Sequence, residues 1–400
     1  MAKIRVTKQT ILEFTFWTLW ILYSFAYVMF SLSNYSRNHN TKFIYALITN
    51  FTIVALLALF LFVRKYSLKK FVMCAVFLMI LFWIEIAAPD KQFLVGTLFI
   101  VVAQNIDVQK GLKLDIKLKT ILTLGVILLC SLGVIENYAV VSNGIYKQSL
   151  GFSNPNVLTC YALAILAEWL CLNYGKMKKW QWVAVALIWY LINEVGGGRS
   201  SSYTFLVILV LFWLANFFPK IFYGKISQLL FGVITPCMAI LSFVLVYFYN
   251  RGNLFVIALN QIMTGRIRMS SYFLSTYGIK PFGQQIVTVS SRRAATQNIS
   301  TMVVDNAYVR CILVYGWIFL VFICATYAIL FLKLIRDKRV EIALLTLFFV
   351  VLGLGEVYML NAMFNYSMLF LLSNNHKKKQ QKLQGEFIDE PIGKCNNNDT

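Results

Sequence analysis

The sequence has few charged residues: 13% are Asp, Glu, Lys or Arg, while 59% are hydrophobic. In a soluble globular domain about a quarter of the residues are charged, so this composition excludes an ordinary soluble enzyme. Acidic residues are scarcest, with 16 against 37 Lys and Arg, and none lies between Asn250 and Val304. We attribute the formal net charge of +21 to loops that face an anionic membrane surface, and we expect no nucleic-acid partner.

Several chemical motifs are also missing. The eight cysteines form no CxxC pair and mostly fall in or beside apolar runs, which indicates buried thiols, not a disulfide framework or metal site. There is no Walker-type phosphate loop, His-Glu zinc pattern or Asp-x-Asp pair. The two histidines, His39 and His376, stand alone in polar segments. We therefore expect neither a metal nor another cofactor.

What the sequence does contain is a series of apolar runs, each long enough to cross roughly 30 Å of hydrocarbon. The first is too long for a signal peptide. The pattern predicts an all-α polytopic membrane protein, with about twelve transmembrane helices in a single domain of residues 1–375. A hairpin turn is expected between the last two spans. The expected spans are Ile11–Leu32, Phe43–Val63, Phe71–Ala88, Gln92–Ile106, Thr120–Glu136, Pro155–Asn173, Trp180–Val195, Ser201–Phe218, Leu229–Tyr249, Asn306–Ile335, Val340–Leu354 and Val357–Leu372.

The distribution of positive charge predicts the orientation. With the amino terminus inside, the cytoplasmic segments, Asp107–Lys119 among them, hold 25 of the 37 Lys and Arg residues. The positive-inside rule therefore places both termini in the cytoplasm. One large extracellular loop, about residues 250–305, then separates helices nine and ten. The polar tail, residues 376–400, is predicted to be cytoplasmic and disordered.

Lysine supplies most of the charge inside, whereas arginine predominates outside. Topology requires only charge, so arginine on the outer face favours recognition of an anion such as a diphosphate, because one guanidinium binds two phosphate oxygens. Chance in a lysine-rich sequence is the alternative. The outer arginines are Arg37, Arg199, Arg251, Arg266, Arg268, Arg292, Arg293 and Arg310.

Three expected helix starts face outward, and unpaired N–H groups at such positions can bind anions. The first is SLGFSNPN, where Asn154 can cap the next span and Asn156 lies in its first turn. The second is GGGRSSS around Arg199, and the third is Asp305-Asn306. Ordinary turn and cap chemistry is the alternative, and it explains Arg199 least well because a cap needs no guanidinium.

Within the large loop, apolar residues from Leu254 to Met263 have helical spacing and predict an interfacial helix. A second helix is expected to run to Tyr277, followed by a turn at Pro281–Gly283. This arrangement holds Arg266 near the membrane surface, where a lipid-linked diphosphate must lie. A segment that only binds lipid headgroups is the alternative.

Five carboxylates stand near the expected outer boundary, where they are costly unless paired or functional. Glu194 precedes Arg199 closely and is a candidate to pair with it. Asp305 and Glu356 are each interpreted as a helix cap, a general base or a group that orients an arginine. The other two are Glu85 and Glu136.

At these residues the chain resembles the superfamily of O-antigen ligases and repeat-unit polymerases of bacterial surface polysaccharides. It is most similar to the capsular polysaccharide polymerases of low-GC Gram-positive bacteria. The similarity covers the second half of the chain, and the first four spans carry no motif. The segments that carry it are Ser149–Asn156, Gly198–Ser202, Thr264–Arg268, Lys280–Gly283, Asp305–Arg310, Val314–Trp317, Glu356, Asn361 and Asn365.

The resemblance implies a multi-pass protein of the bacterial cytoplasmic membrane that joins undecaprenyl-diphosphate-linked oligosaccharide repeats into surface polysaccharide, without nucleotide or metal. Expected partners are the lipid-linked repeats, the bilayer, and the flippase and chain-length regulator of the same pathway. Arg199 and Arg266 would stabilise the departing diphosphate, assisted by Arg268 or Arg310. Ligases usually have a histidine just before the residue matching Asn306, and this chain has Asp305 there, which makes Asp305 the expected base.

The remaining motif residues are expected to act in the same site, Glu356 as a catalytic group and the others in substrate binding. The latter are Asn154, Asn156, Gly283, Asn306 and Tyr308. Three other functions stay open: a lipid-linked oligosaccharide flippase, a ligase-like transferase to another acceptor, and a non-enzymatic scaffold of the capsule machinery.

Overall fold

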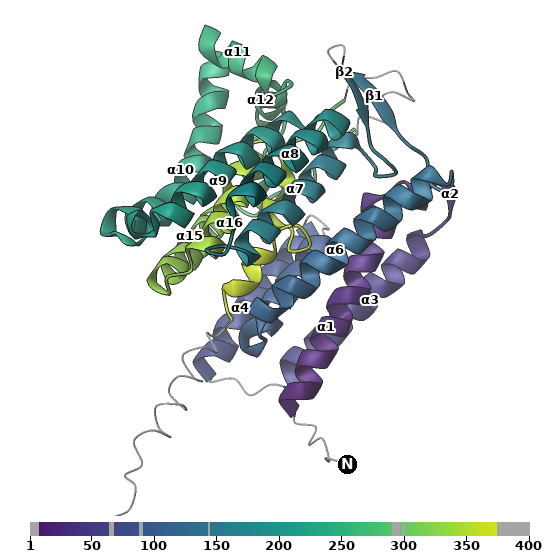
Figure 1. The fold of residues 1–400 in the computed structure, drawn as a ribbon, viewed down its shortest axis with the longest axis vertical. Coiled ribbons are helices and arrows are strands. Elements are labelled where there is room, and N and C mark those ends of the chain that lie inside the picture. The colour runs from purple at the N-terminus through teal and green to yellow at the C-terminus, as the bar shows by residue number, and fades with distance from the viewer. Residues whose placement is uncertain are drawn as a thin grey trace, which may run out of the picture.

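The computed structural model describes residues 8–63, 68–87, 91–142, 145–289, 297 and 301–373. Within these ranges the chain is mostly helical, which confirms the predicted class (Figure 1). One antiparallel hairpin is present, formed by β1 (Ala139–Ser142) and β2 (Ile145–Gln148), with Ala139 opposite Gln148. The predicted tail, residues 376–400, lies outside the described residues.

Helices α1, α3, α4 and α5 follow the first four predicted spans, because contiguous apolar residues favour a structure that satisfies every backbone group internally. Helices α1 and α3 each end in a π-helical turn, Tyr27–Leu32 and Leu59–Val63. The helices are α1 (Lys8–Ala26), α2 (Tyr35–Asn38), α3 (Lys42–Ala58), α4 (Leu68–Ala87), α5 (Lys91–Val102) with a 3₁₀ turn at Ala103–Asn105, and α6 (Val108–Ser131).

The second half packs beside this group, with α7 against α6, α8, α9 and α16, and α10 against α12 and α15. The two helices predicted in the large loop are present as α11 and α12. The elements are α7 (Pro155–Leu172), α8 (Lys179–Gly196), α9 (Arg199–Phe217), a 3₁₀ turn at Pro219–Tyr223, α10 (Lys225–Asn250), α11 (Leu254–Ile262), α12 (Arg266–Tyr277), α14 (Ala307–Arg310), a π turn at Cys311–Tyr315, α15 (Trp317–Arg336) and α16 (Val340–Leu352).

Six helical segments in the described part of the chain are long and apolar enough to cross a membrane, and α5 and α16 are shorter apolar helices. These segments support a membrane protein, whereas the count of twelve spans stays a prediction. In Figure 1 the start of α1 lies at one end of the molecule, and α2, the β1–β2 hairpin, α11 and α12 lie toward the other. The six are Lys8–Leu32, Lys42–Leu61, Pro155–Leu172, Arg199–Phe217, Lys225–Asn250 and Trp317–Arg336.

The predicted helical span Val357–Leu372 is wrong. In its place are two 3₁₀ turns, Val357–Leu360 and Tyr366–Phe370, most of whose residues are buried. Irregular backbone at membrane depth is tolerated only where protein surrounds it and satisfies its polar groups. Side chains do so here: the amide of Asn365 donates to the Met359 carbonyl at 2.9 Å. Lys333 donates to the carbonyls of Phe370, Leu371 and Ser373.

The predicted span Asn306–Ile335 is interrupted at Gly316, which has a φ of 94°. The segment around Pro281 crosses the backbone at this break: a Cβ on Gly316 would lie 2.1 Å from the Pro281 carbonyl oxygen. In the same way, a Cβ on Gly283 would lie 2.1 Å from the Val314 carbonyl oxygen. The two glycines therefore permit a close backbone crossing that ends the large loop against the start of α15.

The segment Asp107–Lys119, predicted to be a cytoplasmic loop, is the first half of α6. Asp115 and Lys119 are buried, and the Lys119 ammonium lies 2.7 Å from Asp115 and 2.6 Å from Glu168 of α7. The indole of Trp20 donates to Asp115 at 2.8 Å. The predicted start of this span at Thr120 is therefore too late, because these charged side chains pair with one another between helices, and a count of loop cations cannot detect such pairing.

Replacement of Lys119 by alanine should destabilise the protein by about 3–5 kcal/mol, because it leaves Asp115 and Glu168 buried without their cation. The matched control is Lys110→Ala on the same helix, whose ammonium is 86% exposed and 3.4 Å from Asp107. An exposed pair contributes about 0–1 kcal/mol. Thermal unfolding of the two purified variants checks this, and equal melting temperatures would contradict it.

Candidate active site

Three cationic side chains meet at one cavity of about 160 Å³: Lys147 of β2, Arg199 at the start of α9 and Arg266 at the start of α12. Asn154 and Asn156, at the start of α7, lie beside them. The structure thus brings together four predicted site residues from three separate segments of the sequence. The remaining lining residues are Val140, Pro155, Gly197, Ser200 and Thr264.

The three glycines before Arg199 explain how it reaches this cavity. Gly197 has a φ of 57° and ends α8. A Cβ on Gly197 would lie 2.7 Å from Cε of Lys147, and one on Gly198 would lie 2.8 Å from Cβ of Thr159. Because these side chains are absent, the α8–α9 turn packs directly on α7 and on the side chain of Lys147. The Lys147 ammonium donates to the Gly197 carbonyl at 2.8 Å, which fixes its position.

Arg266 is held in place by two carboxylates and a serine. Its Nη2 lies 2.5 Å from Oε1 of Glu356, its Nε lies 3.3 Å from Oδ2 of Asp305, and its Nη1 donates to Ser200 at 2.7 Å. A Cβ on Gly355 would lie 2.7 Å from Nη1, so a side chain at this position would press against the guanidinium. Both acids therefore orient this arginine, which was one of the three roles weighed for them.

Charges and burial shift the pKa values of these groups. Burial lowers the pKa of Lys147, and the nearby Arg199 and Arg266 lower it further. Burial raises the pKa of Glu356 to about 7, because the opposing effect of Arg266 is smaller and Asp305 adds to the increase. Burial alone would lower the pKa of Arg266, but Glu356 and Asp305 raise it. The three cations of the cavity thus repel one another, and the two carboxylates pair with Arg266 alone.

A second cavity, of about 380 Å³, adjoins the first and shares Lys147, Gly197 and Arg199 with it. Glu194 lines this cavity, but it forms no ion pair with Arg199, so the predicted pairing is wrong. The guanidinium of Arg199 has no hydrogen bond or ion pair with any residue the structure describes. It is therefore available to an anionic ligand. The other lining residues are Trp189, Asn193, Ser202 and Tyr203.

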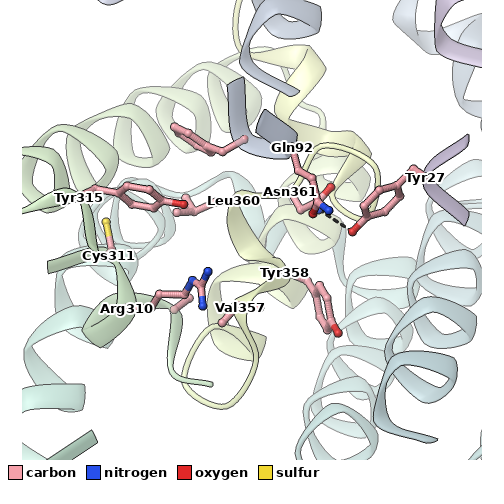
Figure 2. A pocket seen from close by; sticks show the side chains of 11 residues that line it. Tyr27, Gln92, Arg310, Cys311, Tyr315, Val357, Tyr358, Leu360 and Asn361 are labelled. Carbon is pink, nitrogen blue, oxygen red and sulfur yellow. Dashed lines mark hydrogen bonds between the residues drawn. The ribbon is translucent and has the colours of Figure 1, made fainter. Parts of the chain in front are cut away.

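Arg310 lies apart from these cations, at a third cavity of about 140 Å³ (Figure 2). This cavity is bounded by α5, α14 and the segment 357–361. Figure 2 shows the Arg310 guanidinium beside Val357. The other lining residues are Tyr27, Gln92, Phe93, Ala307, Cys311, Tyr315, Tyr358, Leu360 and Asn361.

Two residues predicted to bind substrate have structural contacts instead. The side chain of Asn306 caps α14 and donates to the Leu354 carbonyl at 3.1 Å, which joins α14 to the turn after α16. Tyr308 is fully buried, and its hydroxyl donates to the Val350 carbonyl at 2.7 Å. Neither lines a cavity named above, so they position the site without facing a ligand.

Gly283 belongs to the backbone crossing at Gly316 and lines none of these cavities. Arg268 is exposed on α12, and its backbone N–H donates to the side chain of Asn260. Its guanidinium does not line the cavity of Lys147, Arg199 and Arg266, which we call the cationic cavity. Arg292 and Arg293 lie outside the described residues.

Lys147 is the functional candidate that the sequence did not single out. It is one of the few lysines in the expected outer loops, and it stands two residues before the SLGFSNPN motif. Gln92 and Tyr27 were missed entirely, because they belong to the part of the chain without motifs. Within the described ranges, no group of three or more His, Cys, Asp and Glu residues is placed to hold a metal ion.

Comparison with known proteins does not assign a function to this site. No family model, curated protein or solved structure matches the chain. Function is therefore inferred from the residues of the site and from the motifs they carry.

Proposed function

We propose that this protein polymerises polyprenyl-diphosphate-linked oligosaccharide repeats into surface polysaccharide at the outer face of the bacterial cytoplasmic membrane. The convergence of Lys147, Arg199 and Arg266 on one cavity beside two carboxylates carries the proposal. A diphosphate suits this cavity, since guanidinium groups bind phosphate oxygens in pairs and lysine adds a point charge.

The reaction is a glycosyl transfer with the lipid diphosphate as leaving group. An acceptor hydroxyl attacks the anomeric carbon of the donor, the bond from that carbon to the phosphate oxygen breaks, and its electron pair leaves with the diphosphate. Arg199 and Arg266 stabilise the charge that develops there, assisted by Lys147. A carboxylate accepts the proton of the hydroxyl.

Asp305 is the better base on grounds of access. Its side chain is 33% exposed, whereas that of Glu356 is 7% exposed and hydrogen-bonded to Arg266. Glu356 then keeps the guanidinium of Arg266 in position. The pKa of Glu356, about 7, lets it change charge near neutral pH, so a base role for Glu356 is the competing assignment. Comparison of the pH–rate profiles of Asp305→Asn and Glu356→Gln separates the two.

The lipid chain of the donor also has a candidate site. An apolar groove of about 570 Å³ lies between α6, α7 and α8. It follows α8 from Trp180 to Ile192. Ile192 stands five residues before Gly197 of the cationic cavity, which is about 7.5 Å at a helical rise of about 1.5 Å per residue. A polyprenyl chain in this groove would carry its diphosphate toward Lys147 and Arg199.

The sidedness of the site agrees with the orientation inferred from charge. The hairpin, α11 and α12 lie toward the end of the molecule opposite the start of α1, as the predicted outer segments should (Figure 1). A lipid-linked repeat that has already crossed the membrane would therefore meet the cationic cavity.

Reconstitution tests the proposal directly. The purified protein in lipid nanodiscs should convert lipid-linked repeat units into a ladder of longer glycans, without nucleotide or added metal, and release polyprenyl diphosphate in equal amount to the bonds formed. Transport of the repeats across a vesicle membrane without any ladder would instead indicate a flippase.

A further inference from the structure

The cavity in Figure 2 offers hydrogen-bonding groups that the protein does not use itself. Nε2 of Gln92 donates to Ser31 at 2.9 Å and to Tyr45 at 3.4 Å, which leaves its Oε1 as an acceptor. The guanidinium of Arg310 is half-buried and has no ion pair or hydrogen bond with any residue in the described part of the chain. The cavity therefore presents an acceptor and several donors.

Tyrosines line this cavity, and some are held rigidly. The amide of Asn361 donates to the Tyr27 hydroxyl at 2.7 Å, as the dashed line in Figure 2 shows, and its oxygen accepts from the N–H of Met363. The ring of Tyr358 stacks on Phe364, with centroids 3.9 Å apart. Fixed rings beside amide and guanidinium groups suit a sugar, whose C–H faces pack on aromatic carbon while its hydroxyls donate and accept.

The position of this cavity relative to the carboxylates is also informative. Ala307, in its lining, stands two residues after Asp305, and Val357 directly follows Glu356. The N–H of Ala307 donates to the Gly353 carbonyl at 2.8 Å, so the two segments are joined. Asp305 and Glu356 contact Arg266 of the cationic cavity from these same segments. The acids thus stand where the lining of one cavity meets that of the other.

We propose that this cavity binds the acceptor sugar, at the non-reducing end of the incoming repeat unit, and presents its hydroxyl to Asp305. Arg310 and Gln92 bind the sugar hydroxyls, and Arg310 accordingly serves the acceptor instead of the diphosphate. The inference rests on the proposed polymerase function, because it identifies the second substrate of that reaction.

Equilibrium binding to the full-length protein in nanodiscs tests the subsite. The probes are the repeat-unit oligosaccharide, freed from its lipid by mild acid, and inorganic pyrophosphate. Arg310→Ala and Gln92→Ala should each weaken oligosaccharide binding about tenfold, by loss of hydrogen bonds to the ligand, and leave pyrophosphate binding unchanged. Arg199→Ala should instead weaken pyrophosphate binding and leave oligosaccharide binding unchanged. Retained binding of the second probe shows in each case that the variant is folded.

Arg251→Ala is the matched control, since Arg251 is exposed, stacks on Tyr247 and lines neither cavity. It should change neither affinity. If Arg310→Ala weakens pyrophosphate binding instead, Arg310 belongs to the diphosphate site and the subsite is overturned. A second outcome also overturns the subsite. In it, the wild-type protein produces a glycan ladder, but Arg310→Ala and Gln92→Ala bind the oligosaccharide as tightly as the wild type does. The polymerase proposal would then stand without this subsite. If oligosaccharide binding depends on Arg310 and Gln92 but no ladder forms, the polymerase proposal is overturned, and the cavity remains a sugar-binding site.

Discussion

Replacement of Arg199 by alanine should abolish chain extension while single repeat units still reach the outer surface. The guanidinium of Arg199 is half-buried at the junction of two cavities and has no ion pair within the described ranges. Its charge is therefore free to act on the leaving diphosphate. Removal of one such preorganised donor typically lowers the rate about 10²–10³-fold, and an arginine that stabilises phosphoryl charge contributes up to about 10⁵-fold.

Glycan length on cells that carry Arg199→Ala checks this, together with release of polyprenyl diphosphate by the purified variant. Arg199→Lys should recover only a small part of the activity, because an ammonium cannot bind two oxygens in one plane. Arg251→Ala, at an exposed arginine beside Tyr247, should extend chains normally. Accumulation of single repeat units on the inner leaflet would contradict the polymerase proposal and support a flippase.

The second large effect concerns the pair of Arg266 and Glu356. Arg266→Ala should abolish extension and also destabilise the fold by about 3–5 kcal/mol, because Glu356 would remain buried without its partner. Loss of activity in this variant therefore has two causes, and a second variant must separate them.

The double variant Arg266→Met/Glu356→Leu removes both charges and fills their volume, so it should regain most of the stability. It should stay inactive if the guanidinium stabilises the diphosphate. Thermal unfolding and the in vitro ladder, measured on both single variants and the double variant, form a complete cycle. An active double variant would show that the pair is structural only, and it would contradict the assignment of Arg266.

Hydropathy predicted the helices well where a helix crosses the bilayer independently. The spans that became α3, α7 and α9 differ from prediction by only a few residues. This agreement follows from the solvent, because hydrocarbon leaves the backbone no other partner than its own helix. Prediction failed at residues 357–372, where Asn365 and Lys333 satisfy irregular backbone from a distance. No local pattern encodes such partners.

At the candidate site, too, the sequence predicted some features and missed others. Residue type and motif order nominated Arg199, Arg266, Asp305 and Glu356, since guanidinium and carboxylate groups near hydrocarbon require a reason. They did not pair Arg266 with the two acids, and they missed Lys147. The family resemblance implied that Arg268 or Arg310 assists at the diphosphate, whereas Arg310 lies at the cavity beside Gln92.

The amino-acid sequence by itself thus determined that the chain is a helical membrane protein and which charges need an explanation, because both follow from the cost of moving groups out of water. Only the tertiary structure decided which charges neutralise one another and which stay free for a ligand. Ion pairing depends on separations of a few ångströms between α9, α12 and the turn after α16. Those separations arise from packing, such as the contact of Gly355 with Arg266, and spacing along the chain does not reveal them.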